Sequence, residues 1–379
     1  MHRAGPVPAL LLLLAACAES SGPSRPLLRE VSLQLTSSCG LVPGGTLRCW
    51  GQLPSPWGVG VASEPTGLPS MAPQLVAVEL GFSDGCGIDA DGLAWCWGDN
   101  SFGQLGNGST DQSDTPMLVA GGVRFTQFLR WFDRACGLDR KGGLWCWGHA
   151  LHAPLHASLA DPEPCERLVL GELVESPCVR EPRQVDAPSA YVSLTEQGDG
   201  GCGLTPSGGL ECWGWVYGLH EEYLPTPTAI ALPATFESVS PRGNGWVGTC
   251  AVATDGGVWC WGASPVAPTR RDTPAGVRFR EVSVGGTHAC AVAEDGDAWC
   301  WGLNPRGGLG ILGNGSTTDA AEPVKVLGGL RFTSVSAGSN ATCAVAEDGA
   351  HCWGLNSVGQ LGDGTTQDHP FPTRVSRQD

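Results

Sequence analysis

The tripeptide Cys-Trp-Gly occurs seven times in this chain of 379 residues, and another cysteine precedes the cysteine of each copy by nine or ten positions. Successive copies are 40 residues apart at the closest, from Trp261 to Trp301, and 66 at the most, from Trp147 to Trp213. Units of this length stack on their neighbours to bury faces that one unit cannot bury alone, so the pattern predicts a repeat protein. The repeated pairs are Cys39 with Cys49, Cys86 with Cys96, Cys136 with Cys146, Cys202 with Cys212, Cys250 with Cys260, Cys290 with Cys300 and Cys343 with Cys352.

The sixth unit, residues 279–302, shows what each unit builds. It opens with a short alternating apolar run and continues with two β-prone runs on either side of Asp295-Gly296. Such runs around an Asp-Gly pair predict a β-hairpin. A further extended run, such as residues 323–326, ends most units. About four short strands per unit predict an all-β fold, a seven-bladed β-propeller over residues 27–376.

The hairpin turn also predicts where the cysteines lie. A three-residue loop over residues 90–92 places Cys86 opposite Cys96. Opposed residues of antiparallel strands have β-carbons about 4.5–5.5 Å apart, which is close to the reach of a disulfide. Six pairs share this spacing, whereas the pair of Cys343 and Cys352 is one residue shorter and needs another turn or register. Whether that last pair forms a bridge is left open by the sequence.

The tryptophans allow two interpretations. In a propeller both faces of a blade pack on neighbouring blades. Because side chains alternate along a strand, Trp95 and Trp97 share one face, with Cys96 on the other. We expect the repeated tryptophans to form the core between blades, and the alternative is a ladder of rings that stacks a ligand.

Three units continue into a glycine-rich tail after the tryptophan. Residues 98–108 read Gly-Asp-Asn-Ser-Phe-Gly-Gln-Leu-Gly-Asn-Gly, residues 354–364 repeat the pattern, and a variant follows Trp301. This tail resembles the regulator of chromosome condensation repeat, a family whose seven blades form a closed propeller. The resemblance extends over essentially all of the chain after the N-terminal segment. It implies the fold and no particular activity, because one fold hosts unrelated functions.

The N-terminus predicts export. Residues 1–16 carry an early arginine and a short apolar run that ends in small residues, as a signal peptide does. Leu14-Ala15-Ala16-Cys17 resembles the bacterial lipobox, which implies a lipid on Cys17, while an ordinary signal peptide is the alternative. We expect residues 17–26 to be a flexible tether. Ala18, in place of an aspartate, favours the outer membrane within the cell envelope, with periplasmic or surface exposure left open.

The cysteine count agrees with export. Apart from Cys17, the sixteen remaining cysteines make the seven unit pairs and an eighth pair, Cys165 with Cys178. An even set in an exported chain predicts a disulfide framework. Zinc is disfavoured because the spacings are not the short Cys-x-x-Cys type and no histidines accompany them. We therefore expect no metal and no cofactor.

Charge and motifs restrict the function. The formal net charge is −16, with no basic patch, which argues against nucleic acid and against a bilayer surface bound other than through the lipid. Members of the resembled family include a nuclear nucleotide-exchange factor and a plant photoreceptor. The exported N-terminus argues against nuclear exchange, and the absence of the photoreceptor's Gly-Trp-Arg-His-Thr motif argues against photoreception. Gly81-Phe-Ser83-Asp-Gly85 matches a nucleophile elbow in letters but precedes a hairpin rather than a helix. His288 is expected to be a packing residue, so we expect no enzyme.

The longest unit carries the strongest hint of function. Its excess lies about residues 150–185, and long insertions in repeat proteins often lie on a binding face. We expect a monomer that binds a protein partner there, although an insertion is also tolerated at little thermodynamic cost. The alternative is a carbohydrate-binding module, and a hydrolase or lyase on the propeller is less favoured. The residues expected in the protein-binding surface are Leu168, Val169, Leu170, Glu172 and Glu175, and those of the carbohydrate alternative are Trp57, Trp131, Trp215 and Trp246.

Overall fold

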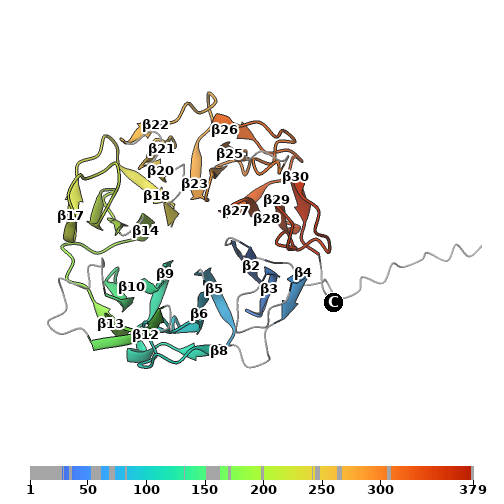
Figure 1. Ribbon diagram of the computed structural model, residues 1–379. Helices are drawn as coiled ribbons and strands as arrows, with labels where there is room; N and C mark the ends of the chain where they lie inside the picture. Colours follow the sequence, from blue (N-terminus) through green and yellow to red (C-terminus); the bar gives the residue numbers. More distant parts are fainter. Residues whose placement is uncertain are drawn as a thin grey trace, which may run out of the picture.

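The computed structural model is a ring of seven mainly antiparallel sheets (Figure 1), and inner strands line a cavity at its centre, here called the channel. Each sheet has four strands arranged from the channel outward, and two sheets carry a fifth strand. The predicted all-β, seven-bladed propeller is thus confirmed. The structure describes residues 28, 30–33, 36–52, 61–67, 73–81, 83–131, 133–150, 163–169, 172–197, 200–240, 242–243, 248–262, 267–304 and 309–376.

The blades follow one another in sequence order. Blade 1 comprises β1 (Glu30–Leu33), β2 (Ser37–Leu41), β3 (Leu47–Gln52) and β4 (Val61–Gly67); blade 2 comprises β5 (Leu75–Leu80), β6 (Asp84–Asp89), β7 (Ala94–Gly98) and β8 (Ser113–Leu118). Blade 3 comprises β9 (Phe125–Trp131), β10 (Arg134–Asp139), β11 (Leu144–His149), β12 (Glu163–Val169) and β13 (Glu172–Gln184). Blade 4 comprises β14 (Ser193–Gln197), β15 (Gly200–Leu204), β16 (Leu210–Gly214) and β17 (Leu224–Ile230). Blade 5 comprises β18 (Phe236–Val239), β20 (Thr249–Ala253), β21 (Val258–Trp261) and β22 (Thr269–Arg270), and its β19 (Arg242–Gly243) adds in parallel to β14 of blade 4. Blade 6 comprises β23 (Phe279–Val284), β24 (His288–Ala293), β25 (Ala298–Gly302) and β26 (Ala320–Lys325); blade 7 comprises β27 (Phe332–Ala337), β28 (Ala341–Ala346), β29 (Gly349–Gly354) and β30 (His369–Arg374). One short 3-10 turn, η1 (Ala120–Gly122), precedes blade 3.

The turn chemistry of the second hairpin sets its register. The Asp89 carboxylate accepts hydrogen bonds from the backbone N–H groups of Asp91 and Leu93, both at 2.9 Å. Gly92 has a φ of 88°, which a side chain would disfavour. This turn places Cys86 opposite Cys96 with their Cα atoms 4.1 Å apart, and the structure bonds the two sulfurs.

The other pairs with ten-residue spacing face each other in the same way and are bonded within their own hairpins. Their Cα atoms are 4.0 or 4.1 Å apart, so all five sites share one geometry. These disulfides join Cys39 to Cys49, Cys136 to Cys146, Cys202 to Cys212, Cys250 to Cys260, and Cys290 to Cys300. In each case the two cysteines are directly opposed residues of neighbouring antiparallel strands, as the spacing predicts.

The hairpin of blade 7 accommodates its shorter spacing with a different turn. Ala346 lies opposite Gly349, so the connection has only two residues, Glu347 and Asp348. The register beyond the turn is regular, and Cys343 lies opposite Cys352 with a Cα–Cα distance of 4.1 Å and a bond between their sulfurs. The turn, and not a shifted register, therefore compensates for the missing residue.

The tryptophan of each Cys-Trp-Gly unit is buried between blades. Trp147 packs with Cys86 and Leu105 of blade 2, and Trp50 packs with Val345 and Leu361 of blade 7. The expectation that these residues form the core between blades is confirmed for the blades in which those clusters lie.

The ring closes without exchange of strands. Blades 1 and 7 each form from their own segment of chain, and their contact is made by side chains and by the tail after blade 7. The Trp50 indole donates a hydrogen bond to the Gln360 carbonyl at 2.9 Å, and the Ser38 hydroxyl donates to the same oxygen at 2.9 Å. The tail of the last unit thus holds the first blade.

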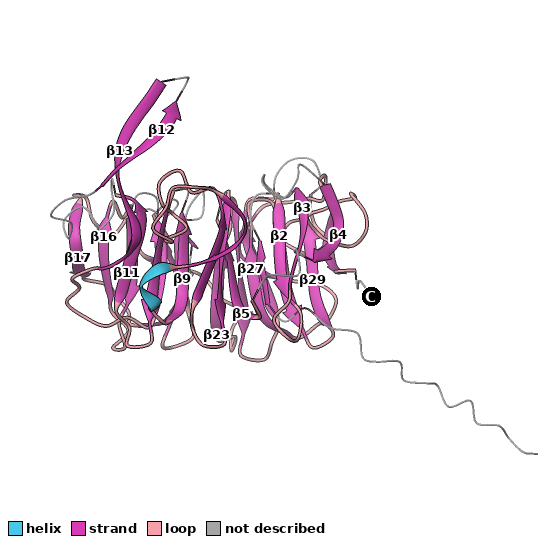
Figure 2. Cartoon of the chain, turned by 90° about the horizontal axis from the view of Figure 1, so that it is seen from below, coloured by secondary structure: helices cyan, strands magenta, loops and turns pink. Residues whose placement is uncertain are grey.

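The insertion forms a β-hairpin. Strands β12 and β13 pair along their length and rise beyond the ends of the other strands (Figure 2). The C-terminal part of β13 is the outer strand of blade 3, because Val179 pairs with Gly148 and Arg183 with Cys146. The expected insertion at about 150–185 is therefore too long at its C-terminal end.

Candidate binding surface

The projecting hairpin has a rigid base. A disulfide joins Cys165 of β12 to Cys178 of β13, and both residues are buried against Phe102 from the tail of blade 2. The Arg180 guanidinium donates to the Pro164 carbonyl at 2.9 Å. The hairpin is therefore fastened across its own two strands and against the neighbouring blade.

Blade 2 holds the hairpin through backbone contacts as well. The N–H of Gly108 donates to the Arg180 carbonyl at 3.0 Å, and a Cβ on Gly103 would lie only 2.9 Å from the Arg180 Cα atom. The rings of Phe102 and His149 have centroids 4.5 Å apart. Because the base is held in place before any partner arrives, little ordering entropy is lost there on binding.

The structure places only some of the expected protein-binding residues. Leu168 and Val169 belong to β12 and Glu172 to β13, while Glu175 on β13 is exposed to solvent. Leu170 lies outside the described residues, and the side chains of Leu168, Val169 and Glu172 are not described. Their part in binding stays a prediction.

Charged residues below the hairpin are paired with one another. Arg130 and Asp84 form an ion pair in which both side chains are fully buried, and Arg130 also donates to the Gln104 carbonyl at 2.8 Å. Arg134 lies 3.9 Å from Glu196, with both side chains largely buried. These groups join blades 2, 3 and 4 and are not exposed for a ligand.

Asp133 and His149 form a second pair at the same end of blade 3. The His149 Nδ1 atom lies 2.9 Å from an Asp133 carboxylate oxygen. Burial alone would raise the pKa of Asp133, but the hydrogen bond from His149 and the charge of Arg134 hold that pKa below its ordinary value. Asp133 is thus a stable anion that orients the imidazole at the foot of the hairpin.

The central channel contains a cavity of about 240 Å³ lined by the inner strands. Glu30 and Glu281 face it, and each accepts a hydrogen bond from the backbone of the next blade, Glu30 from the Val78 N–H at 3.1 Å and Glu281 from the Val335 N–H at 3.2 Å. Burial raises the pKa of Glu30 to about 7, offset in part by that hydrogen bond and increased by nearby Glu79. Burial likewise raises the pKa of Glu281.

Two residues further along the inner strands, serines repeat this arrangement. Each serine hydroxyl accepts a hydrogen bond from a backbone N–H of the following blade. The pairs are Leu80 to Ser32, Val284 to Ser240, Ala337 to Ser283 and Leu33 to Ser336. The polar channel wall therefore links blade to blade, which explains its carboxylates without a ligand.

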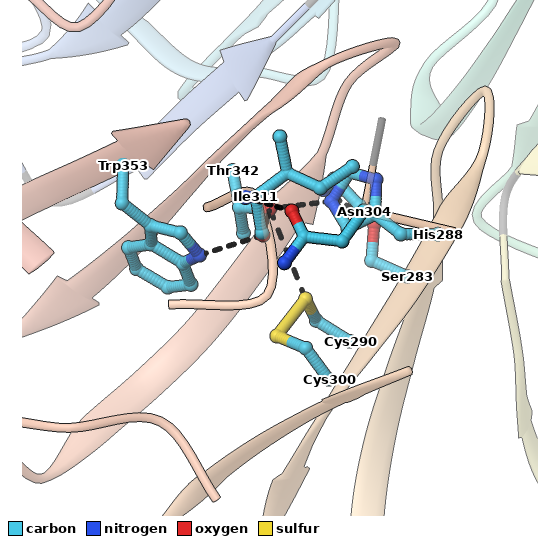
Figure 3. The surroundings of a disulfide bond; sticks show 9 residues. Ser283, His288, Cys290, Cys300, Asn304, Ile311, Thr342 and Trp353 are labelled. Carbon is cyan, nitrogen blue, oxygen red and sulfur yellow. Dashed lines mark hydrogen bonds between the residues drawn. A yellow bond between two sulfur atoms is a disulfide. The ribbon is translucent and has the colours of Figure 1, made fainter. Parts of the chain in front are cut away.

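His288 lies in the core between blades 6 and 7 (Figure 3). Its Nε2 atom is 2.6 Å from the Thr342 hydroxyl oxygen, and burial lowers its pKa to about 4. The same hydroxyl lies 3.8 Å from the sulfur of Cys290. The histidine is thus a neutral packing and hydrogen-bonding residue, as the sequence predicts.

The serine of the elbow-like motif is not in the structural setting that the motif requires. Ser83 lies in the connection between β5 and β6 and is followed by a strand, so the letters of the elbow motif are not matched by its strand-to-helix turn. Among the described residues there is also no group of three or more histidine, cysteine or acidic side chains that could hold a metal ion. No helix of the described residues is long and apolar enough to span a bilayer.

Of the tryptophans proposed for carbohydrate binding, the structure describes only the side chain of Trp215. It follows β16 in blade 4 and is 38% exposed. Trp57 and Trp246 lie outside the described residues, as does the side chain of Trp131. Tyr217 and Tyr223 lie close to Trp215 in the chain and were not among the candidate binding residues predicted from the sequence. The sequence does contain a signal for them, because this short segment holds two of its three tyrosines.

Comparison with known proteins identifies the repeat. Two family models described as regulator of chromosome condensation repeats match this chain. The first matches residues 91–139, 295–345 and 347–378, and the second matches 76–104, 279–307 and 332–360.

A curated relative, the ultraviolet-B receptor of Arabidopsis thaliana, is 32% identical over 104 residues. This match covers 27% of the present chain and 23% of the receptor, so the chain matches less than a quarter of that relative's length.

Several solved structures share the fold. Prp20p of Saccharomyces cerevisiae has a TM-score of 0.68 at 20% identity, over 92% of this chain and 87% of that one. Yeast RCC1 (Prp20) with Kap60 bound gives 0.66 at 19% identity, over 97% and 91%. The CRINKLY WD40 ectodomain of an Arabidopsis thaliana receptor kinase gives 0.55 at 18% identity, over 93% and 100%. The chain therefore contains segments that match the regulator of chromosome condensation repeat, and it folds as a seven-bladed propeller.

Proposed function

We propose that this chain is a non-enzymatic recognition scaffold that binds a protein partner through the face from which the β12–β13 hairpin projects. The observation that carries the proposal is the hairpin itself, which rises beyond the blades while its base is fixed by the disulfide between Cys165 and Cys178 and by blade 2 (Figure 2). A projecting, pre-ordered element is suited to recognition because it loses little conformational entropy when a partner binds. In the described residues, the outer half of the hairpin pairs strand to strand within the hairpin, so we expect the propeller to fold without it.

Structural neighbours support a protein partner. Of the two yeast structures, one has Kap60 bound, and the other was studied for its binding to Gsp1p and histones. Those partners belong to those proteins, and we extend to the present chain only the general use of the propeller as a protein-binding body.

We further propose that the protein is exported and held in the cell envelope by a lipid on Cys17, with the outer membrane favoured. The motivation is the Leu14-Ala-Ala-Cys17 sequence directly after the apolar run. Eight disulfides are consistent with an oxidising compartment. Mass spectrometry of the native protein should find a lipidated N-terminal Cys17, and an unmodified N-terminus at another residue would contradict the anchor.

The binding proposal is tested by removing the hairpin without damaging blade 3. Because His149 pairs with Cys178 and Gly148 with Val179, the cut must leave residues 178–184 in place. Replacing residues 150–177 by Asn-Gly, together with Cys178→Ser, closes β11 onto β13 with a two-residue turn. We expect a melting temperature close to that of the unaltered protein and loss of the proteins captured from envelope extracts.

A pair of point variants supplies the control. Glu175→Arg reverses an exposed charge on the hairpin, whereas Glu347→Arg reverses an exposed charge in the β28–β29 turn, at the other end of the blades. Capture should weaken for the first variant and not for the second. Undiminished capture by the hairpin deletion would refute the proposal, and collapse of its melting transition would show that the hairpin is needed for the fold.

A further inference from the structure

A short aromatic segment in blade 4 departs from the repeat at the point where other units hold their neighbours. In blades 2, 6 and 7 the tail after the tryptophan offers a backbone carbonyl to the indole N–H of the next blade. These hydrogen bonds join Trp147 to Gln104, Trp353 to Ile311 and Trp50 to Gln360. After blade 4 the equivalent segment, residues 214–224, reads Gly-Trp-Val-Tyr-Gly-Leu-His-Glu-Glu-Tyr-Leu and lacks the Gly-Gln-Leu-Gly pattern.

The exchange has a visible structural cost. Trp261 of blade 5, the next blade, is fully buried, and its indole Nε1 atom has no hydrogen-bond partner among the described residues. A buried donor without a partner is unfavourable. This segment therefore does not supply the hydrogen bond that stabilises the fold elsewhere in the ring, and it exposes aromatic side chains instead.

The aromatic side chains lie on a turn with a fixed backbone. The Val216 carbonyl accepts hydrogen bonds from the N–H groups of Leu219 and His220, both at 3.2 Å, and the Val216 side chain is buried. Trp215 is 38% exposed and Tyr217 is 54% exposed. Within the described residues, Phe371 of blade 7 is the other aromatic side chain among the exposed large apolar residues.

Tyr223 completes the surface. Its ring centroid lies 5.9 Å from that of Trp215, with the two planes at 59°, so the rings form a corner. Burial raises the pKa of Tyr223, and the charge of Arg134 of blade 3 partly offsets the rise. The corner lies in the segment between β16 and β17, whose Val216 and Leu224 pack in the same core cluster as Trp261 of blade 5.

The charges around the corner are negative. Glu221 and Glu222 lie in the same turn and are exposed, and residues 214–224 contain no lysine or arginine. Arg134, whose charge acts on Tyr223, is largely buried beside Glu196. Aromatic faces attract ammonium and guanidinium groups, and flanking carboxylates strengthen the attraction. We propose that Trp215, Tyr217 and Tyr223 form a binding site for an arginine- or lysine-bearing segment of the protein partner, with Glu221 and Glu222 as its anionic rim.

This inference rests on the proposed function and is tested separately from it by calorimetric titration. The probes are the peptide Gly-Arg-Gly-Arg-Gly-Arg-Gly, the same peptide with glutamate in place of arginine, and cellohexaose. Because a chain of net charge −16 attracts any cationic peptide, the decisive result is its dependence on the aromatic residues. Trp215→Ala should weaken arginine-peptide binding by roughly 3- to 30-fold.

Phe371→Ala removes an aromatic side chain that is 48% exposed on β30 and serves as the matched control, with unchanged binding expected. The double variant Glu221→Gln/Glu222→Gln should bind more weakly and respond less to added salt. No binding of the arginine peptide, or equal losses from Trp215→Ala and Phe371→Ala, would overturn the site. Cellohexaose binding that disappears in Trp215→Ala would instead assign the surface to carbohydrate.

Partner capture separates this inference from the proposed function. If the hairpin deletion abolishes capture and Trp215→Ala leaves it intact, the scaffold function survives and the cation site falls. If neither change affects capture, the proposed function fails as well. Loss of capture by both, with Phe371→Ala unaffected, supports the two together.

Discussion

The tryptophans of blades 1 and 5 offer a matched test of how the repeat tail stabilises the ring. Trp50 and Trp261 hold the same place in their units, and both are 0% exposed. The Trp50 indole N–H donates to the Gln360 carbonyl at 2.9 Å, whereas that of Trp261 has no partner among the described residues. Substitution by phenylalanine removes the indole N–H and a similar volume at each site. The difference between the two variants therefore reports the hydrogen bond.

The magnitude follows from the two environments. Trp50→Phe loses a hydrogen bond with a net contribution of about 0.5–1.5 kcal/mol, although Ser38 still donates to the Gln360 carbonyl. Trp261→Phe removes a buried donor that has no partner among the described residues. Its removal offsets part of the free-energy cost of the cavity that the smaller ring leaves. Trp50→Phe should thus be the more destabilising change, by about 1–3 kcal/mol. At ~2.1 cal/mol/K per residue for 379 residues, this corresponds to a difference of about 1–4 °C in melting temperature.

Calorimetry and denaturant titration without reductant would measure both variants. A second matched pair repeats the comparison, since Trp353 donates to the Ile311 carbonyl at 3.0 Å and Trp301 has no partner among the described residues. If Trp261→Phe and Trp301→Phe destabilise as much as their counterparts, the tail hydrogen bonds do not stabilise the ring and the reasoning is wrong.

Three further predictions concern the channel, the core and the disulfides. The folded-state pKa of Glu30 is raised from 4.5 to about 7, so its contribution to stability is complete below pH 4.5 and disappears as the pH rises through about 7. Glu30→Gln keeps the acceptor for the Val78 N–H and should be more stable than the unaltered protein at pH 8 by up to about 3 kcal/mol, with no such gain in urea titrations at pH 4. Arg130→Met leaves the buried Asp84 carboxylate without its partner and should lower the free energy of unfolding by about 3–5 kcal/mol in urea titrations at pH 8. Adding Asp84→Asn should recover most of that loss. Non-reducing peptide mapping should find Cys343 joined to Cys352 and every other bridge within its own blade, and a bridge between blades would contradict the hairpin register.

The sequence predicts the hairpins well because their determinants are local. A turn residue such as Gly92, with cysteines at equal distances on either side, fixes which residues face each other, and Cys86 does lie opposite Cys96. The turn that joins the strands of Cys343 and Cys352 could not be predicted from the sequence, since their shorter spacing is compatible with a two-residue turn and with a shifted register.

The outer strand of blade 3 was missed although it has a recognisable pattern. Residues 182–185 read Pro-Arg-Gln-Val, matching Pro-Val-Lys-Val at 323–326 and Pro-Thr-Arg-Val at 372–375. In each case the final valine is buried and its N–H pairs with the third strand of its blade, as Val185 does with the Leu144 carbonyl at 2.8 Å. The excess length of this unit does not show where the insertion ends, whereas the proline of this pattern places the end of the insertion before residue 179.

The function of the tail could not be predicted because its partner lies in another unit. The Gln104 carbonyl belongs to blade 2, while its donors, Trp147 and Arg130, belong to blade 3. In the last unit the equivalent carbonyl, that of Gln360, accepts its hydrogen bond from Trp50 in the first unit. Composition and spacing within a unit contain no information about such contacts.

The distribution of these contacts around the ring bears on where recognition can evolve. The tails that hydrogen-bond to the tryptophan of the next blade follow blades 2, 6 and 7. The first of the two repeat models matches these three regions, and neither model matches between residues 140 and 278. That unmatched stretch contains both the β12–β13 hairpin and the aromatic turn at residues 215–223, which lie on adjacent blades (Figure 1). Because the tail of blade 7 already closes the ring on blade 1, blades 3 and 4 can change their connecting segments without opening the propeller. A surface for one partner is thus expected on this side of the ring, and substitutions there should alter binding while leaving the melting temperature unchanged.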